Sequence, residues 1–308
     1  MIEEFQRRLA AGEVVLLDGG TGTELEARGV PVRDGVWSSL ASLDHADVLR
    51  VVHEDYIRAG AEIIIANTFA ANRLVLEPAG LGERVADINT RAVEIAVQAR
   101  ENAAERPVLV AGSVTPLGTE EDPDPDADRE HVLGCFREQV ALQADAGVDL
   151  FALEMIPSTL YGSAAAQAAR EAELPVLLGV SAGWSGEIGP AATGSRALSS
   201  LVKELAGPGV IAVAAMHTQM DEVGATLDEI ERGWPGAVGA YPHHGDWNPP
   251  HWVFHDIPPE RFAAAATGWV GRGAQLIGGC CGIRPSHIAL LKEQLPTHIP
   301  GTARRSVC

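Results

Sequence analysis

Eight short apolar runs recur along the whole chain, and this repetition constrains the fold more than any other feature of the sequence. Each run ends in Gly, Pro, Asn, Thr or another polar residue, and each is followed by a stretch with helical periodicity. Continuous apolar runs of this length are typical of strands buried on both faces, and their alternation with helices predicts parallel βαβ units. The runs cover residues 13–20, 61–69, 107–114, 149–157, 174–183, 210–218, 237–244 and 274–282.

Eight such units predict an α/β fold, a single (β/α)8 barrel of the TIM type, rather than an open doubly wound sheet. An open sheet usually has fewer strands, and the G-x-G-x-x-G segment of a dinucleotide site is missing from DGGTGTEL after the first run. The helical pattern is clearest over 46–62 and 83–103, and Gly60 and Gly147 stand where helices should end. Because no Pro/Gly/Ser-rich linker divides the chain, we expect one domain over residues 1–308, with its core at about 13–295.

Charge and hydropathy exclude several classes of function. The 42 acidic and 23 basic residues give a formal net charge of −19, which repels phosphate backbones and anionic membrane surfaces. No stretch approaches the roughly 18 apolar residues of a membrane span, and the N-terminus has no apolar signal core. We expect a soluble, cytoplasmic protein that acts on small molecules, with no nucleic-acid or membrane partner; a homo-oligomer is compatible with the sequence.

Two of the four cysteines are adjacent, which is the most informative local feature. Adjacent cysteines rarely bridge to each other, so Cys280 and Cys281 are better interpreted as free thiols or metal ligands. Gly278, Gly279 and Gly282 would let the chain leave the strand so that both thiolates reach one zinc ion. Catalytic zinc keeps one position open and needs a third protein ligand from elsewhere. The alternative is a pair of small buried hydrophobic side chains.

The polar residues that close the runs are the candidates for chemistry, because TIM barrels place their active sites at the C-terminal ends of the strands. They are Asp18, Asn67, Ser113, Glu154, Ser181, His217, His243, Cys280 and Cys281. Aromatic residues near the same ends could bind a cation: Trp37, Phe69, Tyr241, Trp247 and Trp252. They could equally pack a loop. We expect the acidic stretch 119–130 to be a solvated loop.

Six ordered segments resemble the signature blocks of the homocysteine S-methyltransferase family. GGCCG, within residues 277–282, is the most specific of them. The resemblance implies a zinc ion held by three cysteines, two of them from GGCC, which keeps homocysteine as a thiolate that attacks a methyl donor. No protein side chain is then needed as the nucleophile. The segments are residues 18–25, 66–72, 111–116, 153–157, 241–245 and 277–282.

The chain departs from the family at the third zinc ligand. Where the family has a segment resembling G-x-N-C, this sequence reads AAMHT, which puts His217 in the place of the cysteine. Since Cys2His is an accepted catalytic set, the resemblance implies a Zn²⁺ site of His217, Cys280 and Cys281. An isolated strand-end histidine would more often be structural. The family's YPN block becomes YPHHG, so His243 or His244 could be a displaceable fourth ligand, or a solvent-facing loop residue.

This exchange also changes the charge of the site. Three thiolates on Zn²⁺ give a net charge of −1, whereas two thiolates and a neutral imidazole give 0. The zinc becomes a stronger Lewis acid and a bound thiolate becomes a weaker nucleophile. The substrate or the donor could therefore differ from the usual pair of the family.

The resemblance also implies a substrate-binding set: Asp18, Gly19, Gly20, Thr21, Asn67 and Glu154. Asp18 and Glu154 would receive the ammonium group of the amino acid, because a buried ammonium needs acceptors and each carboxylate supplies two oxygens. The alternatives are a turn or N-cap role for Asp18 and a paired strand-end acid for Glu154.

Together these features predict a zinc-dependent methyltransferase of methionine biosynthesis. It would move a methyl group from a small sulfonium or quaternary ammonium donor, such as S-methylmethionine or betaine, to homocysteine or a related thiol or selenol. A small donor is expected because no cobalamin or folate segment follows before Cys308. Two alternatives remain open: a barrel lyase or hydrolase whose zinc activates water or polarises a carbonyl, and a non-catalytic member that binds thiol amino acids or zinc.

Overall fold

The computed structural model of the chain describes residues 1–116, 128–156, 159–182, 197–248 and 251–301. Residues 119–127 of the predicted acidic loop (119–130) lie outside these ranges, as do the side chains of residues 246–252. Within the described part of the chain, no helix is long and apolar enough to cross a membrane.

Eight parallel strands form one sheet, in the order β1-β10-β7-β6-β5-β4-β3-β2. β1 and β2 stand at the two ends of this order, and a parallel bridge between Leu17 and Ile63 joins them. The amide of Asp18 also donates to the carbonyl of Ile63 at 3.0 Å, so the sheet closes into a barrel. Each predicted run contains one strand, so the predicted TIM-type barrel is confirmed. The strands are β1 (Val15–Leu16), β2 (Ile63–Ile65), β3 (Leu109–Val114), β4 (Leu150–Ile156), β5 (Val176–Val180), β6 (Val210–Gln219), β7 (Ala237–His243) and β10 (Ala274–Ile277).

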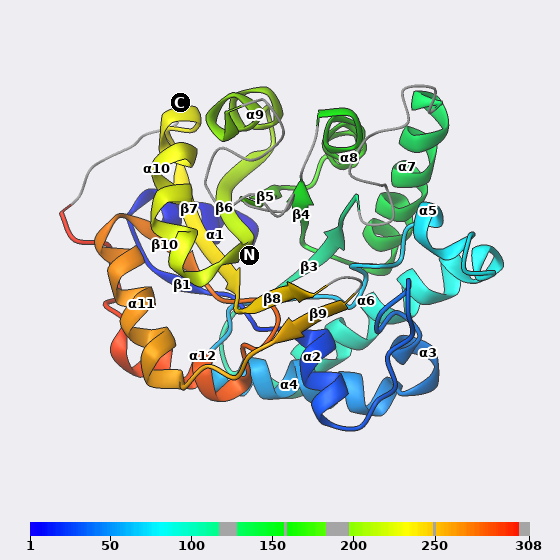
Figure 1. Cartoon of the computed structure of the whole chain (residues 1–308), viewed down its shortest axis with the longest axis horizontal. Coiled ribbons are helices and arrows are strands. Elements are labelled where there is room, and N and C mark those ends of the chain that lie inside the picture. Colours follow the sequence, from blue (N-terminus) through cyan, green and yellow to red (C-terminus); the bar gives the residue numbers. More distant parts are fainter. Residues whose placement is uncertain (117–127, 157–158, 183–196, 249–250, 302–308) are drawn as a thin grey trace.

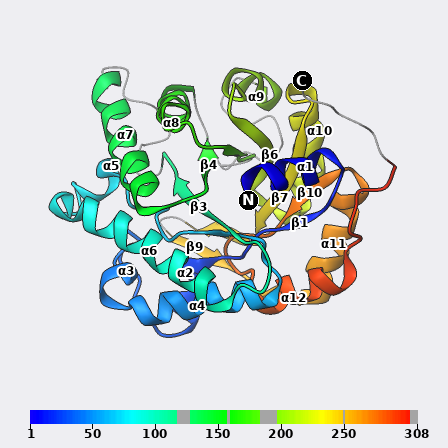
Figure 2. The ribbon, with the colours of Figure 1, turned by 180° about the vertical axis from the view of Figure 1, so that it is seen from behind.

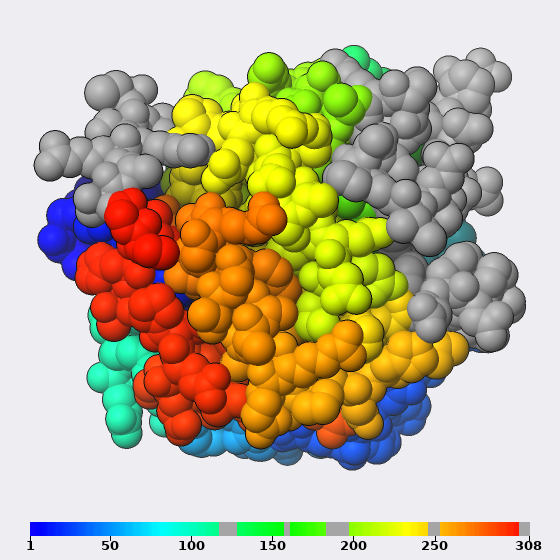
Figure 3. All heavy atoms as spheres, turned by 60° about the vertical axis from the view of Figure 1, so that its left-hand side comes forward, coloured from blue at the N-terminus to red at the C-terminus, as the bar shows by residue number. Residues whose placement is uncertain are grey.

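A ring of helices surrounds the barrel (Figure 1). It consists of α4 (Ala46–Ala59), α6 (Val85–Ala103), α7 (Arg129–Ala146), α8 (Thr159–Glu171), α9 (Leu198–Leu205), α10 (Val223–Gly233), α11 (Pro259–Gly271) and α12 (Pro285–Gln294). Gly60 and Gly147 follow α4 and α7 with φ of 130° and 103°, as predicted from their positions. In Figure 3 the yellow, orange and red parts of the chain, which include α10 to α12, lie side by side as one outer face.

Shorter elements complete the connections. They are α2 (Thr21–Ala27), α3 (Ala41–Asp44), α5 (Arg73–Leu76) and the 3-10 turns η1 (Gly82–Arg84) and η2 (Met220–Glu222). An antiparallel hairpin of β8 (Gly245–Asn248) and β9 (His251–Phe254) follows β7 and was not predicted. It lies in front of the barrel in Figure 1. Phe254 of β9 makes a T-shaped ring contact with Trp37, at a centroid distance of 6.0 Å. The hairpin therefore belongs to the end of the barrel where the strands finish.

The opposite end of the barrel is closed by α1 (Ile2–Ala10), which lies across it in Figure 2. Phe5 and Leu9 of this helix pack with Val15 and Leu17 in the apolar interior of the barrel. The side chain of Gln275 donates to the carbonyls of Leu9 and Glu13, which ties the helix to β10. Since apolar packing and satisfied polar groups stabilise without reacting, this end is a structural base.

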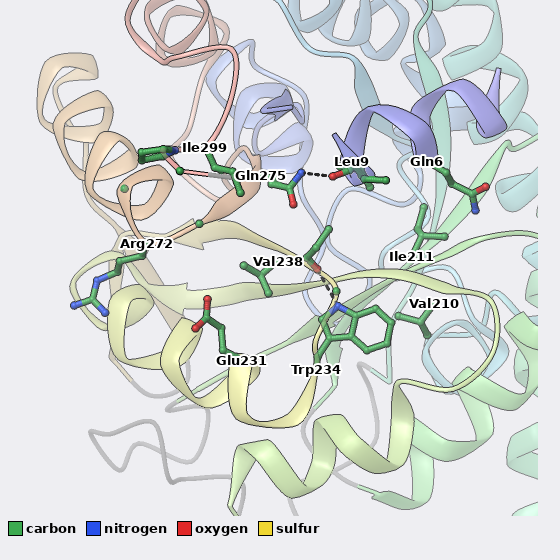
Figure 4. A pocket seen from close by; sticks show the side chains of 17 residues that line it. Gln6, Leu9, Val210, Ile211, Glu231, Trp234, Val238, Arg272, Gln275 and Ile299 are labelled. Carbon is green, nitrogen blue, oxygen red and sulfur yellow. Dashed lines mark hydrogen bonds between the residues drawn. The ribbon is translucent and has the colours of Figure 1, made fainter. Parts of the chain in front are cut away.

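A cavity of about 450 Å³ opens beside α1 at this base (Figure 4). It lies at the starts of β6, β7 and β10, and none of the described residues that line it is a cysteine or a histidine. Chemistry in a TIM barrel belongs at the other end of the strands, so this cavity is not the candidate active site. Its wall includes Leu9, Val210, Trp234, Val238, Gln275 and Ile299.

Candidate metal and substrate site

Two irregular strand ends shape the mouth of the barrel. The pairing register shifts between Leu153 and Ile156 on β4, and between Met216 and Gln219 on β6. At these bulges Met155 and His217 take the left-handed backbone conformation, with φ of 56° and 49°. Such a conformation costs about 1–3 kcal/mol for a residue with a side chain, and residues that adopt it occur most often at functional sites. The bulges break strand alternation where Glu154 and His217 project into the mouth.

Cys280 and His217 come together at this mouth. The Sγ atom of Cys280 lies 3.3 Å from Nδ1 of His217 and 3.5 Å from Sγ of Cys281. Cys280 and His217 are buried, while Cys281 is partly exposed. The neighbouring Cys281 and burial raise the pKa of the Cys280 thiol well above its ordinary value. The adjacent His217 opposes this shift of the Cys280 pKa but does not outweigh it.

Close backbone packing brings the cysteines to this position. A Cβ atom on Gly278 would lie 2.7 Å from the carbonyl oxygen of Asp18, so only glycine fits there. The amide of Cys280 donates to the carbonyl of Pro242 at 2.7 Å, and Gly282 turns the chain away with φ of 85°. The glycines thus let the chain leave β10 next to β1 and β7.

Glu154 occupies the other side of the His217 ring. Its Oε2 atom lies 3.0 Å from Nε2 of His217, and its Oε1 atom accepts a short hydrogen bond from the hydroxyl of Ser113. All three side chains are buried. Burial lowers the pKa of His217, but Cys280 and Glu154 outweigh it and raise this pKa to about 10.

Asp18 is fully buried at the end of β1 and makes two hydrogen bonds. Its Oδ2 atom accepts from the amide of Ile65 at 2.7 Å, and its Oδ1 atom lies 3.2 Å from the hydroxyl of Tyr241. Burial raises the pKa of Asp18 well above its ordinary value, although these hydrogen bonds oppose the shift. A positively charged group beside Asp18 would lower that pKa again, which suits a carboxylate that receives an ammonium group.

The other members of the predicted substrate set lie around the same strand end. Gly19 and Gly20 link β1 to α2, which begins at Thr21, and the amide of Gly20 donates to the carbonyl of Ile283. Asn67 follows β2, and its side-chain amide makes two hydrogen bonds with Ser38. It accepts from the Ser38 hydroxyl at 2.9 Å and donates to the Ser38 carbonyl at 2.8 Å. Asn67 therefore holds the loop before α3 against the mouth.

Aromatic rings border the His217 side of the site. Phe69 lies 5.1 Å from the His217 ring between centroids and is tilted by 32°, and Tyr241 lies 6.5 Å away, edge-on. Trp37 contacts the hairpin through Phe254, and the side chains of Trp247 and Trp252 lie outside the described part. Phe69 and Tyr241 are therefore the predicted aromatic residues that the described structure places beside His217.

His243 ends β7 and is buried against the edge of Phe254, at a centroid distance of 6.3 Å. Burial, followed by the nearby His217 and His244, lowers the pKa of His243 to about 3. This imidazole is neutral at physiological pH and could act as a metal ligand. His244 instead faces His255, with ring centroids 5.8 Å apart.

The donors at the mouth fit a zinc ion by chemistry and by two of their separations. In a tetrahedral site, neighbouring ligands lie about 3.8 Å apart for two sulfurs and about 3.6 Å apart for sulfur and nitrogen. The Cys280–Cys281 and Cys280–His217 distances of 3.5 and 3.3 Å are close to these values. Within the described residues, no three such side chains already converge on one point, so a bound ion would have to draw the third donor inward.

Comparison with known proteins identifies the family. The family model described as homocysteine S-methyltransferase matches residues 15–295.

The chain belongs to the homocysteine S-methyltransferase family. Homocysteine S-methyltransferase from Escherichia coli is 31% identical over 301 residues, which cover 92% of this chain and 95% of the relative. Selenocysteine Se-methyltransferase from Brassica oleracea is 27% identical over 321 residues, which cover 92% of this chain and 89% of that relative.

Solved structures agree with this family assignment. The metallated form of a homocysteine methyltransferase from Escherichia coli superimposes with a TM-score of 0.76 at 29% identity, covering 92% of this chain and 96% of that one. This homocysteine S-methyltransferase-family chain is therefore a methyltransferase-type enzyme with a TIM-barrel fold.

Sequence reasoning missed some contacts of this family member. Ser38 carries no motif that would pair it with Asn67, because the two are 29 residues apart and meet only through tertiary structure. Tyr56 donates from its hydroxyl to the carbonyl of Ile283 at 2.8 Å and so fixes the turn after the cysteines. Ser113 was selected as a strand-end residue, but its bond to Glu154 depends on the bulge in β4.

Proposed function

We propose that the chain is a zinc-dependent methyltransferase that moves a methyl group from a small sulfonium or quaternary ammonium donor to homocysteine or a related thiol or selenol. The observation that carries this proposal is the buried contact between Cys280 and His217, beside Cys281, at the mouth of a barrel of this family. The selenocysteine Se-methyltransferase among the relatives supports including a selenol acceptor. The product with homocysteine would be methionine, and the acting unit would be one domain over residues 1–308.

His217, Cys280 and Cys281 would hold the zinc ion, with His243 as a fourth ligand that substrate displaces. Zinc, when bound, would lower the pKa of the acceptor thiol so that it is the nucleophile at neutral pH. The two cysteines would supply the negative charge and His217 a neutral nitrogen, for a net charge of 0. The raised pKa of the Cys280 thiol implies that binding releases protons, so affinity should rise with pH.

Asp18 and Glu154 would receive the ammonium group of the acceptor. The amide of Ile65 and the hydroxyl of Tyr241 fix the Asp18 carboxylate before substrate arrives, which reduces the cost of ordering it. The backbone around the β1 turn and the loop held by Asn67 would complete this side of the pocket, through Gly19, Gly20, Thr21 and Asn67. Phe69 and Tyr241 would border the path of a cationic donor.

The test is a methyl-transfer assay on the purified, zinc-loaded protein. Homocysteine and selenocysteine are each offered with S-methylmethionine and betaine, and methylated product is measured by mass spectrometry. We expect product with at least one pair and none from the Cys280→Ser/Cys281→Ser variant. Hydrolysis of ester or amide substrates without any methyl transfer would contradict the proposal, as would tight binding of acceptors without turnover.

A further inference from the structure

The two nitrogens of the His217 ring face different kinds of atom. Nε2 lies 3.0 Å from an oxygen of Glu154, and Nδ1 lies 3.3 Å from the sulfur of Cys280. An ionised carboxylate only accepts hydrogen bonds, so the proton of a neutral His217 belongs on Nε2. The lone pair of Nδ1 is then directed toward the cysteine, where a metal would be held.

The Glu154 carboxylate is itself held from the opposite side. Ser113 donates to its second oxygen, and the carbonyl of Ser113 accepts from Thr68 at 3.0 Å and from Gln143 at 3.0 Å. These contacts join the ends of β3, β4 and β6 in one buried series. Because the carboxylate is fixed at both oxygens, it can fix the direction of the imidazole as well.

The His217 ring needs such a support. Its backbone has φ of 49° at a bulge, and the Phe69 ring packs against the imidazole. Stacking restrains the plane of the imidazole but not a flip of about 180° around the Cβ–Cγ bond, so hydrogen bonds must decide which way the ring nitrogens point. An imidazole that ligates a metal is commonly oriented by a carboxylate on its other nitrogen, and losing that carboxylate usually costs 10- to 100-fold in metal affinity.

We propose that Glu154 is a positioning residue for the metal ligand His217, and that Ser113 sets the orientation of Glu154. This inference rests on the proposed function, in which His217 binds zinc. The oxygens of Glu154 retain lone pairs that Ser113 and His217 do not use, so the same carboxylate can also accept the ammonium group of the substrate. One buried acid then links the amino group of the acceptor to the geometry of the metal site.

The test is zinc affinity, measured by competition with a chromophoric chelator on the full chain. We expect Glu154→Ala to weaken zinc binding by about 10- to 100-fold and Ser113→Ala by a few-fold. Glu154→Gln keeps an oxygen acceptor for Nε2 and should weaken it less, and it serves if the Ala variant does not fold. Nitrogen-15 NMR of the zinc-loaded protein should show the His217 proton on Nε2.

The same Glu154→Ala substitution in the His217→Cys variant separates this inference from the proposed function on which it rests. In His217→Cys the thiolate needs no imidazole orientation, so adding Glu154→Ala should leave zinc affinity within about two-fold, while acceptor binding still falls. An equal loss of zinc affinity in both backgrounds would overturn the positioning role. If His217→Ala keeps full affinity, the proposed metal site is wrong instead; if it loses zinc while Glu154→Ala does not, the ligand stands and the positioning role is wrong.

Discussion

The C-terminal mouth of the barrel buries charged and strained residues, whereas the N-terminal base buries apolar ones. At the mouth, Asp18, Glu154 and His217 are all buried, and His217 and Met155 have left-handed backbone. At the base, α1 adds Phe5 to an apolar interior. The same strands run through both ends. The contrast teaches that stability is concentrated at the base, while the mouth accepts desolvation and strain in order to hold reactive groups close together.

The largest expected effect is at the mouth. Replacing Cys280 and Cys281 together by alanine removes both thiolates and should abolish zinc binding, because the remaining imidazoles of His217 and His243 are too few ligands to hold the ion. The contrast predicts that the apo fold survives. Elemental analysis and thermal unfolding of metal-free samples measure the two properties separately. Unchanged zinc content in this variant would remove the basis of the proposed function.

Truncation at the base should have the reverse effect. Phe5 is 4% exposed in the barrel interior, so Phe5→Ala should reduce the free energy of unfolding by about 3–5 kcal/mol through lost burial and a cavity. Zinc affinity of the folded fraction should stay the same. Chemical denaturation and chelator competition measure the two quantities. A loss of zinc affinity without a loss of stability would break the separation between the two ends.

His53, on α4 in the outer ring, tests whether a buried polar group outside the mouth costs stability. Burial lowers its pKa from 6.5 to about 4, and neither ring nitrogen has a hydrogen-bond partner among the described residues. As pH falls from 6.5 toward 4 the unfolded chain takes up a proton that the folded chain does not, so stability falls by up to about 3 kcal/mol. His53→Leu should remove this part of the slope. Urea unfolding at several pH values will show whether the slope persists.

A smaller effect is expected for Asp18. Asp18→Asn should weaken acceptor binding by about 1.5–3 kcal/mol, the scale of a hydrogen bond to a charged group, and should leave zinc in place. Isothermal titration with homocysteine measures the binding, and elemental analysis provides the control. Zinc loss in this variant would show that Asp18 supports the metal rather than the ammonium group.

The fold could be predicted from sequence because its signals are local and repeated. Apolar runs such as residues 61–69 and the helical period of 83–103 each specify an element without reference to the rest of the chain. The β8–β9 hairpin was missed because each of its strands has only four residues. Its sequence pattern is limited to Trp247 and Trp252 on either side of an Asn-Pro-Pro segment, which is too short to indicate two strands. Helix α1 was missed because its apolar residues are few.

The sequence could predict which residues lie at the candidate site but not the hydrogen bonds between them. Parallel strands of a barrel finish at one end, so His217 and Cys280 had to lie near each other. The hydrogen bond between Glu154 and His217 depends on two bulges and on the left-handed backbone of Met155, which tertiary packing sets. The sequence predicted a substrate role for Glu154, with a paired strand-end acid as the alternative, but it could not predict that His217 and Ser113 are its partners.

The most direct test of the account is the zinc affinity of His217 variants. We expect His217→Ala to bind zinc at least about 10-fold more weakly, and His217→Cys to restore binding with a net charge of −1. X-ray absorption should report two sulfur ligands in the native protein and three in His217→Cys, each gaining one when homocysteine binds. If His217→Ala binds zinc as tightly as the native protein and His217→Cys still shows two sulfur ligands, His217 is not a ligand and the central claim is wrong.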